Sequence, residues 1–324
     1  ISGTYYSDYL YWDPSGSGAW KVGSAQVHLG QNAGQTSQNT NAVALGYYAG
    51  NSTQGSNAVA LGTQAGQISQ GGSAVAIGTL AGYTSQDILA IAVGAGAGRT
   101  SQGNSAVGIG TNAGNTSQGL NAIAIGTSAG SATQGTSAVA MGYQAGQTNQ
   151  QTLAIAIGSQ AGQIDQSGNA VAIGVNAGYS NQQTYAVAIG QSAGQTSQGD
   201  SAVAIGSGAG LTNQGNRAVA VGIGAGALDQ SGNAVAIGSD AGQNTQGIGA
   251  VGVGYQAGNN NQGNYAVAIG YQGGAVNQRA NSIVINASGA ALNGTDVSAC
   301  YVKPIRNNAG PQYLTYDPTS SEIT

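Results

Sequence analysis

The chain is built from one phrase of small and large apolar residues that recurs every 16 positions. In the segment Ala202-Val203-Ala204-Ile205-Gly206, small alanines alternate with larger aliphatic residues, and a glycine ends the run. Glycine recurs at every sixteenth position from Gly30 to Gly270, and a second glycine follows four residues later each time. A fixed period of this length is typical of a solenoid, in which each repeat forms one coil. Because the register never drifts, we expect stacked coils rather than flexible low-complexity sequence.

Each repeat predicts a short β-strand with two apolar faces. In one repeat, Ala58 and Ala60 alternate with Val59 and Leu61. A strand with one face in water would carry polar residues there, so this pattern predicts that both faces are buried. One face fits the interior of the coil, packed against Ala65 and its equivalents in a second strand. The alternation alone leaves open which face this is.

The other apolar face calls for a partner. Stacked over the repeats, one pair of large aliphatic residues per coil would leave a bare stripe of more than about 1,000 Å², whereas the largest apolar patch on a monomer is about 300–600 Å². We therefore predict an all-β, parallel β-solenoid with 16-residue coils that does not remain a monomer.

A glutamine follows the repeat glycine by eight residues in every coil. These glutamines are Gln38, Gln54, Gln70, Gln86, Gln102, Gln118, Gln134, Gln150, Gln166, Gln182, Gln198, Gln214, Gln230, Gln246, Gln262 and Gln278. The residue before each of them is Ser, Thr, Asn or Asp, and glycine follows most of them, which is typical of a turn. Turn propensity does not itself require glutamine. We therefore predict a structural ladder, in which amides stacked about 4.8 Å apart hydrogen-bond along the axis. The functional alternative is an exposed polar stripe that contacts a ligand.

Composition divides the chain into three parts. Residues 1–24 are rich in tyrosine and tryptophan and predict an N-terminal cap, in which 13–18 form a turn between two short strands. Residues 25–286 form sixteen to seventeen coils, and residues 287–324 leave the repeat and predict a C-terminal β cap. A solenoid needs such caps because its bare ends present unpaired strand edges.

The two ends share a pattern of the type Tyr-x-Asp-Pro, at 11–15 and, in close variant, at 316–319. The plainer interpretation is two similar turns in unrelated caps. The sharper hypothesis is that the ends of neighbouring molecules bind each other head to tail, which generates an open filament. The candidate residues for this contact are Tyr9, Tyr11, Trp12, Asp13, Trp20, Tyr301, Arg306, Tyr313 and Tyr316. In the C-terminal part, strands are expected over 301–306 and 312–316.

Residues with catalytic or ligand-binding chemistry are scarce. Charged residues make up 5% of the chain and the net charge is −4, so there is no basic field for nucleic acid or an anionic membrane. No apolar run approaches the roughly 18 residues needed to span a bilayer. His28, the single histidine, stands where other coils have alanine, and we predict a packed or axial side chain rather than a base. With Cys300 as the single cysteine, we expect no enzyme, cofactor or metal site. The chain begins at Ile1 rather than methionine, so we expect a processed or partial gene product.

The repeat resembles a known family in its strand. The phrase Asn169-Ala170-Val171-Ala172-Ile173-Gly174, followed by Ala177-Gly178, is similar to the head repeat of YadA-like trimeric autotransporter adhesins, and Asn281-Ser282-Ile283-Val284-Ile285 is similar to it too. The resemblance covers about four-fifths of the chain and departs after the strand, where these repeats are longer. It implies a left-handed parallel β-roll with three chains around one axis, at a surface outside the cell. It transfers no ligand-binding residue.

The C-terminal segment resembles a second group. Pro304-Ile305-Arg306-Asn307, Leu314-Thr315-Tyr316-Asp317-Pro318 and Glu322-Ile323 are similar to the ending of fibre-type surface proteins of large DNA viruses and phage-like elements. Together, the two resemblances imply an extracellular, adhesin-like structural fibre on a cell or virion surface, which the head-to-tail hypothesis would extend into a filament.

The alternative from another class is a ligand-binding solenoid, with a glycan or ice surface made from the repeated Thr, Ser and Asn positions. Thr36, Thr84, Thr100 and Thr116 recur at one place in the coil. Apolar residues interrupt this row at Ile68, Ala132, Ile164, Leu228 and Val276. A flat ice-binding face would not tolerate these interruptions.

Overall fold

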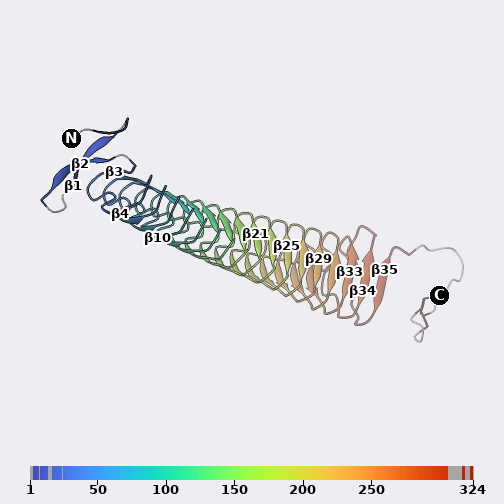
Figure 1. Cartoon of the computed structure of the whole chain (residues 1–324). Coiled ribbons are helices and arrows are strands. Elements are labelled where there is room, and N and C mark those ends of the chain that lie inside the picture. Colours follow the sequence, from blue (N-terminus) through green and yellow to red (C-terminus); the bar gives the residue numbers. More distant parts are fainter. Residues whose placement is uncertain are drawn as a thin grey trace.

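The computed structural model of the chain describes residues 3–6, 8–13, 17–23 and 25–305, with the backbone of 316–317 and 322–323. The described residues form a parallel β-solenoid of about 17 turns without any helix (Figure 1). The rod is long and narrow, and the two ends of the chain lie at its opposite ends (Figure 1). The predicted all-β solenoid with coils 16 residues apart is confirmed.

Two parallel sheets run the length of the rod. The first, here called the aliphatic sheet, contains β3 (Val27–Leu29), β5 (Val43–Leu45), β7 (Val59–Leu61), β9 (Val75–Ile77), β11 (Ile91–Val93), β13 (Val107–Ile109), β15 (Ile123–Ile125), β17 (Val139–Met141), β19 (Ile155–Ile157), β21 (Val171–Ile173), β23 (Val187–Ile189), β25 (Val203–Ile205), β27 (Val219–Val221), β29 (Val235–Ile237), β31 (Val251–Val253), β33 (Val267–Gly270), β34 (Ile283–Asn286) and β35 (Cys300–Lys303). Each strand pairs with the strands of the coils before and after it, so that residues 16 apart, such as Ala172 and Ala188, stand in one column.

The second sheet, here called the glutamine sheet, has 15 strands. They are β4 (Thr36–Gln38), β6 (Ser52–Gln54), β8 (Ile68–Gln70), β10 (Thr84–Gln86), β12 (Thr100–Gln102), β14 (Thr116–Gln118), β16 (Ala132–Gln134), β18 (Thr148–Gln150), β20 (Ile164–Gln166), β22 (Ser180–Gln182), β24 (Thr196–Gln198), β26 (Thr212–Gln214), β28 (Leu228–Gln230), β30 (Asn244–Gln246) and β32 (Asn260–Gln262).

The second strand differs from the sequence prediction. The segment before each glutamine, predicted as a turn, is itself the second strand, and Ala65, predicted within a strand, lies in the turn between the sheets. In a regular strand, residues two apart share a face. Here Thr148 is exposed whereas Gln150 is buried, because Asn149 between them has a positive φ of 56° that breaks the alternation. The turn-forming residue that the sequence shows is therefore placed inside a short, bent strand.

The interior between the sheets is filled by alanine and glutamine side chains. Ala202, Ala204 and Ala209 have no exposed surface, whereas Val203 is half-buried and Ile205 is 38% exposed. The alternation that the sequence left open is thus resolved, since the small face points inward and the large face points outward. The coil has room for methyl groups and one glutamine but not for a branched aliphatic side chain. In the single chain the large aliphatic face is therefore open.

Each coil closes through five residues with positive φ. In the coil that starts at Gly206 these are Gly206, Gly208, Gly210, Asn213 and Arg217. Gly206 has a φ of 127°, a value essentially restricted to glycine, and this explains the glycine at the start of every repeat. Asn213 and Arg217 lie near 55°, in the left-handed region that Asn and Asp adopt most readily among residues with a side chain.

The parts outside the repeat also form strands. At the N-terminal end, β1 (Tyr9–Asp13) and β2 (Ala19–Gly23) pair as an antiparallel hairpin. Of the turn predicted between them at 13–18, residues 14–16 lie outside the described residues. At the other end, β35 extends the aliphatic sheet by one more parallel strand. Beyond it, β36 (Tyr316–Asp317) pairs antiparallel with β37 (Glu322–Ile323). The strand predicted over 312–316 otherwise lies outside the described residues.

Candidate functional site

The repeated glutamines form one continuous column inside the rod. Gln150 is 1% exposed, and its Nε2 donates to Oε1 of Gln166 at 3.0 Å. Its own Oε1 accepts from Nε2 of Gln134 at 3.1 Å. The same bond joins each glutamine to the next from Gln54 to Gln278, at 2.9–3.1 Å. Because these side chains are buried, they contact no ligand; the functional alternative of an exposed glutamine stripe does not fit this geometry.

The glutamine column also joins the two sheets. Nε2 of Gln150, in β18, donates to the carbonyl oxygen of Val139, in β17, at 2.9 Å. This bond crosses the interior of a single coil, whereas the bond to Gln166 connects neighbouring coils. One side chain thus fixes both the spacing of the sheets and the stacking of the coils.

The column ends differently at its N-terminal end. Nε2 of Gln38 does not reach Gln54, whose buried Oε1 has no hydrogen-bond partner among the described residues. Instead, Nδ1 of His28 lies 3.1 Å from Oε1 of Gln38. Because that oxygen is an acceptor, this contact places the imidazole proton on Nδ1. His28 is half-buried in the first coil, in the column that alanine occupies elsewhere.

The N-terminal hairpin packs on this histidine. The Tyr11 ring contacts the His28 ring edge to face, with centroids 4.3 Å apart. The Tyr9 hydroxyl donates to the carbonyl oxygen of Gln26 at 2.8 Å and accepts from the backbone N–H of His28 at 3.1 Å. Burial raises the pKa of the Tyr9 hydroxyl. Two of the predicted end-to-end contact residues are therefore engaged inside their own chain.

Of the other end-to-end contact candidates at the N-terminal end, the two tryptophans are exposed to solvent. Trp12 and Trp20 are 53% and 56% exposed and pack edge to face, with centroids 5.6 Å apart. Asp13 forms an ion pair with Lys21 across the hairpin. The hairpin thus presents two exposed indole rings at the N-terminal end of the rod.

At the C-terminal end, the Tyr301 hydroxyl donates to the carboxylate of Asp296 at 2.7 Å. Tyr316 is described in its backbone, within β36, and Arg306 and Tyr313 lie outside the described residues. The described residues of the two groups lie at opposite ends of the rod (Figure 1). One chain therefore does not bring them together.

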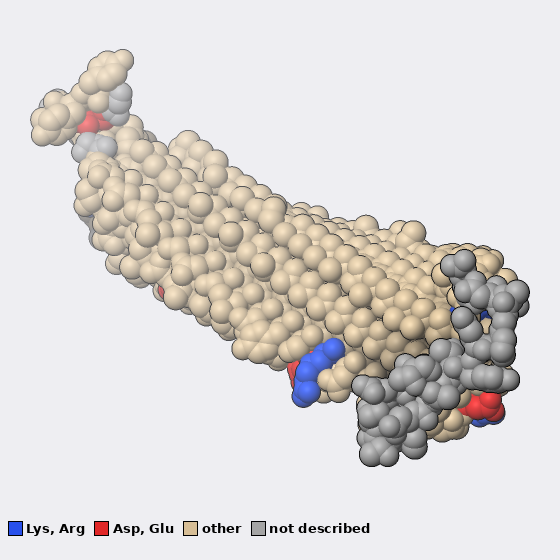
Figure 2. All heavy atoms as spheres, turned by 90° about the vertical axis from the view of Figure 1, so that its right-hand side faces the viewer, with Lys and Arg blue, Asp and Glu red and all other residues tan. Residues whose placement is uncertain are grey.

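The large aliphatic side chains form an uninterrupted exposed face on the aliphatic sheet. Leu61 is 39% exposed, Ile173 36% and Ile285 41%, although they stand at the start, middle and end of the rod. The half-buried valine two residues before each of the first two adds a second column beside them. Figure 2 shows how few charged side chains interrupt the rod surface in that view. This apolar face runs along the whole aliphatic sheet.

The Thr, Ser and Asn row lies on the outer side of the glutamine sheet. Thr36 and Thr116 are exposed there, and Thr84 and Thr100 are half-buried. The interrupting residues share the same row, and both Ile68 and Leu228 are exposed.

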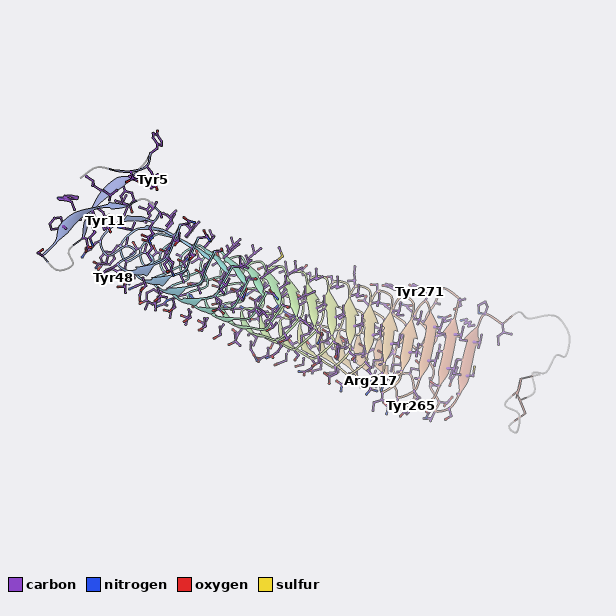
Figure 3. The ribbon with its side chains drawn as sticks, viewed as in Figure 1. Tyr5, Tyr11, Tyr48, Arg217, Tyr265 and Tyr271 are labelled. Atoms are coloured by element: carbon purple, nitrogen blue, oxygen red, sulfur yellow. The ribbon has the colours of Figure 1, made fainter. Side chains whose placement is uncertain are left out.

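One corner of the coil carries a pattern that the sequence reading missed. Between residues 88 and 248, large exposed side chains stand two or three residues after the ladder glutamine in every second coil: Ile88 and Leu89, Leu120, Leu153, Tyr185, Arg217 and Ile248. The alternation ends there, because the next coil carries the exposed Tyr265 at the same place. The coils between them carry small or polar residues there, such as Asn104, Gly168 and Gly232. Figure 3 shows Arg217 on one edge of the rod. Alignment of the repeats in pairs, with a period of 32, would have found this signal.

Within the described residues there is no group of three or more His, Cys, Asp or Glu side chains able to hold a metal ion. The same residues contain no helix long and apolar enough to cross a membrane. Cys300 is a free, exposed thiol in β35. Comparison with models of known families, with curated proteins and with solved structures finds no match to this chain.

Proposed function

We propose that the chain is the subunit of a homotrimeric surface fibre, a stiff rod that provides reach and attachment. The observation that carries this proposal is the exposed aliphatic face, represented by Ile173 and Ile205, which runs the length of the aliphatic sheet. Apolar patches of this extent on soluble proteins usually mark an interface. Full burial of such a side chain contributes about 1.5–3 kcal/mol, and roughly a third of this remains to be gained because Ile173 and Ile205 are 36% and 38% exposed. Summed over sixteen stacked coils, this gain favours association.

The composition of the interior supports the same conclusion. A core of alanine methyl groups removes little apolar surface from water for each residue that is ordered. The valine and isoleucine side chains that would normally supply a core stand outside it, as Val203 and Ile205 do. Association through the aliphatic sheet would give the rod a shared core made by several chains.

A parallel trimer meets this need by turning three aliphatic sheets toward one axis. The similarity of the Asn-Ala-Val-Ala-Ile-Gly phrase to trimeric adhesin heads favours three chains over two. Sixteen coils at about 4.8 Å give a rod on the order of 75 Å long. Hydrogen-bonded ladders along this whole length favour a stiff rod, which suits a surface fibre outside the cell or virion. We propose no cofactor and no catalytic step for it.

Aspartate substitutions on the two faces of one rod test the assembly. Val171→Asp with Ile173→Asp places two charges on the aliphatic face, and we expect loss of the trimer or of solubility. Thr196→Asp places a charge on the exposed side of the glutamine sheet and is the matched control. The control variant should assemble like the native chain. Equal behaviour of the two variants would contradict an interface on the aliphatic sheet.

We propose further that trimers join head to tail into filaments. Trp12 and Trp20 provide exposed aromatic area at one end of the rod, of the kind enriched in protein interfaces. Because Asp13 already pairs with Lys21, the hypothesis rests on these rings rather than on charge. Negative-stain microscopy should show long fibres for the intact chain and discrete rods after deletion of residues 1–20. Single rods at high concentration of the intact chain would refute polymerisation.

A further inference from the structure

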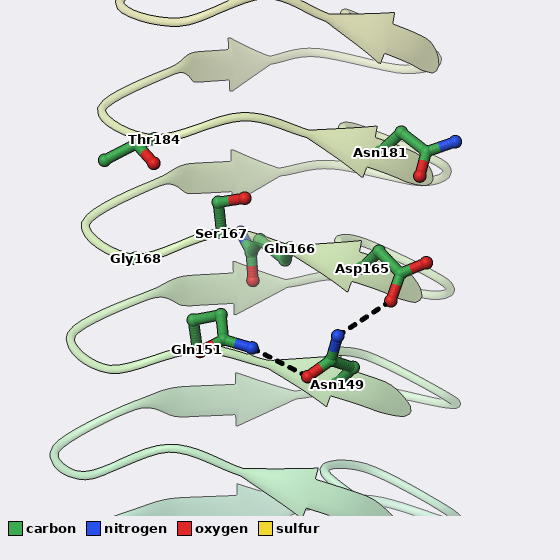
Figure 4. Close-up of a pocket in the computed structure, with 8 residues that line it drawn as sticks. All are labelled: Asn149, Gln151, Asp165, Gln166, Ser167, Gly168, Asn181 and Thr184. Carbon is green, nitrogen blue, oxygen red and sulfur yellow. Dashed lines mark hydrogen bonds between the residues drawn. The ribbon is translucent and has the colours of Figure 1, made fainter.

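A polar depression of about 400 Å³ lies at the edge of the glutamine sheet, beside the ends of β18, β20 and β22 (Figure 4). Asn149 and Asp165 stand on one side of it, and Thr184 stands on the other (Figure 4). Gly168 contributes backbone in place of a side chain to this lining. The volume lies within the range of about 300–1,000 Å³ that is usual for small-molecule sites.

The depression exists because three neighbouring coils depart from the repeat. Most coils place glycine directly after the ladder glutamine, but these three place Gln151, Ser167 and Gln183 there. The middle coil then has Gly168 at the next position, between coils that carry Thr152 and Thr184. Side chains on both flanks and a glycine between them leave this hollow. A second hollow, of about 420 Å³, lies further along the rod beside Asn261, Asn277 and Arg279.

The hydrogen bonds of the lining leave several polar groups free. Nδ2 of Asn149 donates to Oδ1 of Asp165 at 2.9 Å, and Nε2 of Gln151 donates to Oδ1 of Asn149 at 2.7 Å (Figure 4). These bonds orient the Asp165 carboxylate and leave its Oδ2 without a hydrogen bond from any described residue. The Asn181 amide and the Thr184 hydroxyl are likewise unbonded within the described structure. Donors and acceptors therefore line the hollow together.

We propose that this hollow binds a neutral sugar ring. A carboxylate accepts hydrogen bonds from two adjacent hydroxyl groups, while an amide and a hydroxyl can both donate and accept. No lysine or arginine lines the hollow, and the negative charge of Asp165 disfavours phosphate, sulfate and carboxylate ligands. The proposal assigns a ligand that the fibre proposal does not, and it holds for a monomer as well as for a trimer.

The chain contains its own matched control four coils further along. The segment Leu228-Asp229-Gln230-Ser231-Gly232-Asn233 repeats Ile164-Asp165-Gln166-Ser167-Gly168-Asn169 almost residue for residue. Nδ2 of Asn213 donates to Oδ1 of Asp229 at 2.9 Å, the same bond that Asn149 makes to Asp165. Glycines flank this second coil where glutamines flank the first. The second coil therefore has an equivalent carboxylate, but it lacks the glutamine side chains in the neighbouring coils.

Saturation-transfer NMR with the methyl glycosides of glucose, galactose and mannose tests the site on the intact chain. We expect transfer to the ring protons of at least one of them, and affinity lowered about tenfold or more by Asp165→Ala or Gly168→Gln. Asp229→Ala and Gly232→Gln should leave binding unchanged. A Cβ at Gly168 or at Gly232 would lie 3.4 Å from a single backbone oxygen, so the two glutamine substitutions have equal room to fold.

Three results would overturn the proposal. They are no transfer to any of the three glycosides, an equal loss of binding in the control variants, and binding of N-acetylneuraminic acid, an anionic sugar, as tight as that of the neutral glycosides. Because each measurement uses the soluble chain in whatever assembly state it has, failure here leaves the trimer proposal untouched. Failure of the trimer proposal likewise leaves the sugar site standing.

Discussion

Gly162 has no room for a side chain because Gln166 of the same coil occupies the space. A Cβ on Gly162 would lie 2.7 Å from both Cδ and Oε1 of Gln166, closer than real contacts allow. The same pair recurs in the neighbouring coil, where a Cβ on Gly178 would lie 2.7 Å from Oε1 of Gln182. The four-residue spacing between glycine and glutamine is thus one structural unit, in which the glycine makes room for the ladder.

We expect Gly162→Ala to destabilise the rod by more than the cost of a left-handed alanine alone, which is about 1–2 kcal/mol. Gly208→Ala is the matched control, because Gly208 also has a positive φ but a Cβ there would meet no atom within 4 Å. Thermal unfolding followed by circular dichroism compares the two variants. In a Gln166→Ala background, the cost of Gly162→Ala should fall, since the obstructing side chain is gone. An unchanged cost in that background would contradict the coupling.

Removal of one ladder member tests the hydrogen-bonded column. Gln150→Leu leaves Oε1 of Gln166 and the carbonyl oxygen of Val139 without their donor, and each buried unsatisfied group costs about 1–3 kcal/mol. Gln191→Leu changes an exposed glutamine whose side chain makes no hydrogen bond to a described residue, and it is the control. The first variant should melt at a clearly lower temperature than the second. Equal melting temperatures would mean that the column adds no stability.

The left-handed residue before the ladder glutamine predicts a stabilising substitution. Thr133 has a φ of 56°, which a β-branched residue adopts only with strain, whereas asparagine adopts it readily. Thr133→Asn should therefore raise the melting temperature by an amount equivalent to about 0.5–1 kcal/mol. Thr148→Asn, in a strand position without positive φ, should give no such gain. A similar rise in melting temperature in both variants would mean that the asparagine side chain, rather than relief of backbone strain, causes the stabilisation.

The N-terminal hairpin should loosen at alkaline pH. Burial raises the pKa of the Tyr9 hydroxyl above its ordinary value of 10.0, so the folded hairpin holds the proton more tightly than the unfolded one. The stabilisation of the hairpin by the protonated Tyr9 hydroxyl is complete below pH 10 and is lost as the pH rises through the raised pKa. The chain has two tryptophans, Trp12 in β1 and Trp20 in β2, so tryptophan fluorescence reports on this hairpin. Tyr9→Phe should flatten the pH dependence of the fluorescence midpoint; an identical pH dependence in both proteins would exclude Tyr9 as its source.

Much of the fold could be predicted from the period, and the reason is steric. A register that returns every 16 residues admits few structures besides stacked coils, and a glycine such as Gly206 marks a φ that other residues cannot adopt. The face that points inward could not be predicted, because Ala204 and Ile205 are both apolar and nothing local distinguishes core from interface. The narrow interior of the coil decides which face points inward, because it has room for alanine but not for isoleucine.

The second strand was predicted at the wrong residues because the segment that forms it also has the sequence of a turn. Asn149 before Gln150 is typical of a turn, and it does take a left-handed conformation, but within a strand that pairs with its neighbours. The polar hollow at Asp165 was missed for a different reason. It arises from three successive coils that differ from the average repeat, whereas a search for periodicity emphasises what the repeats share.

The central claim is that the aliphatic sheets of three chains form one core. Sedimentation equilibrium of the intact chain at micromolar concentration measures the mass of the particle directly. We predict three times the chain mass of 31.4 kDa, with no populated monomer. A stable, soluble species of 31.4 kDa would contradict the account, because the aliphatic face would then remain open to water.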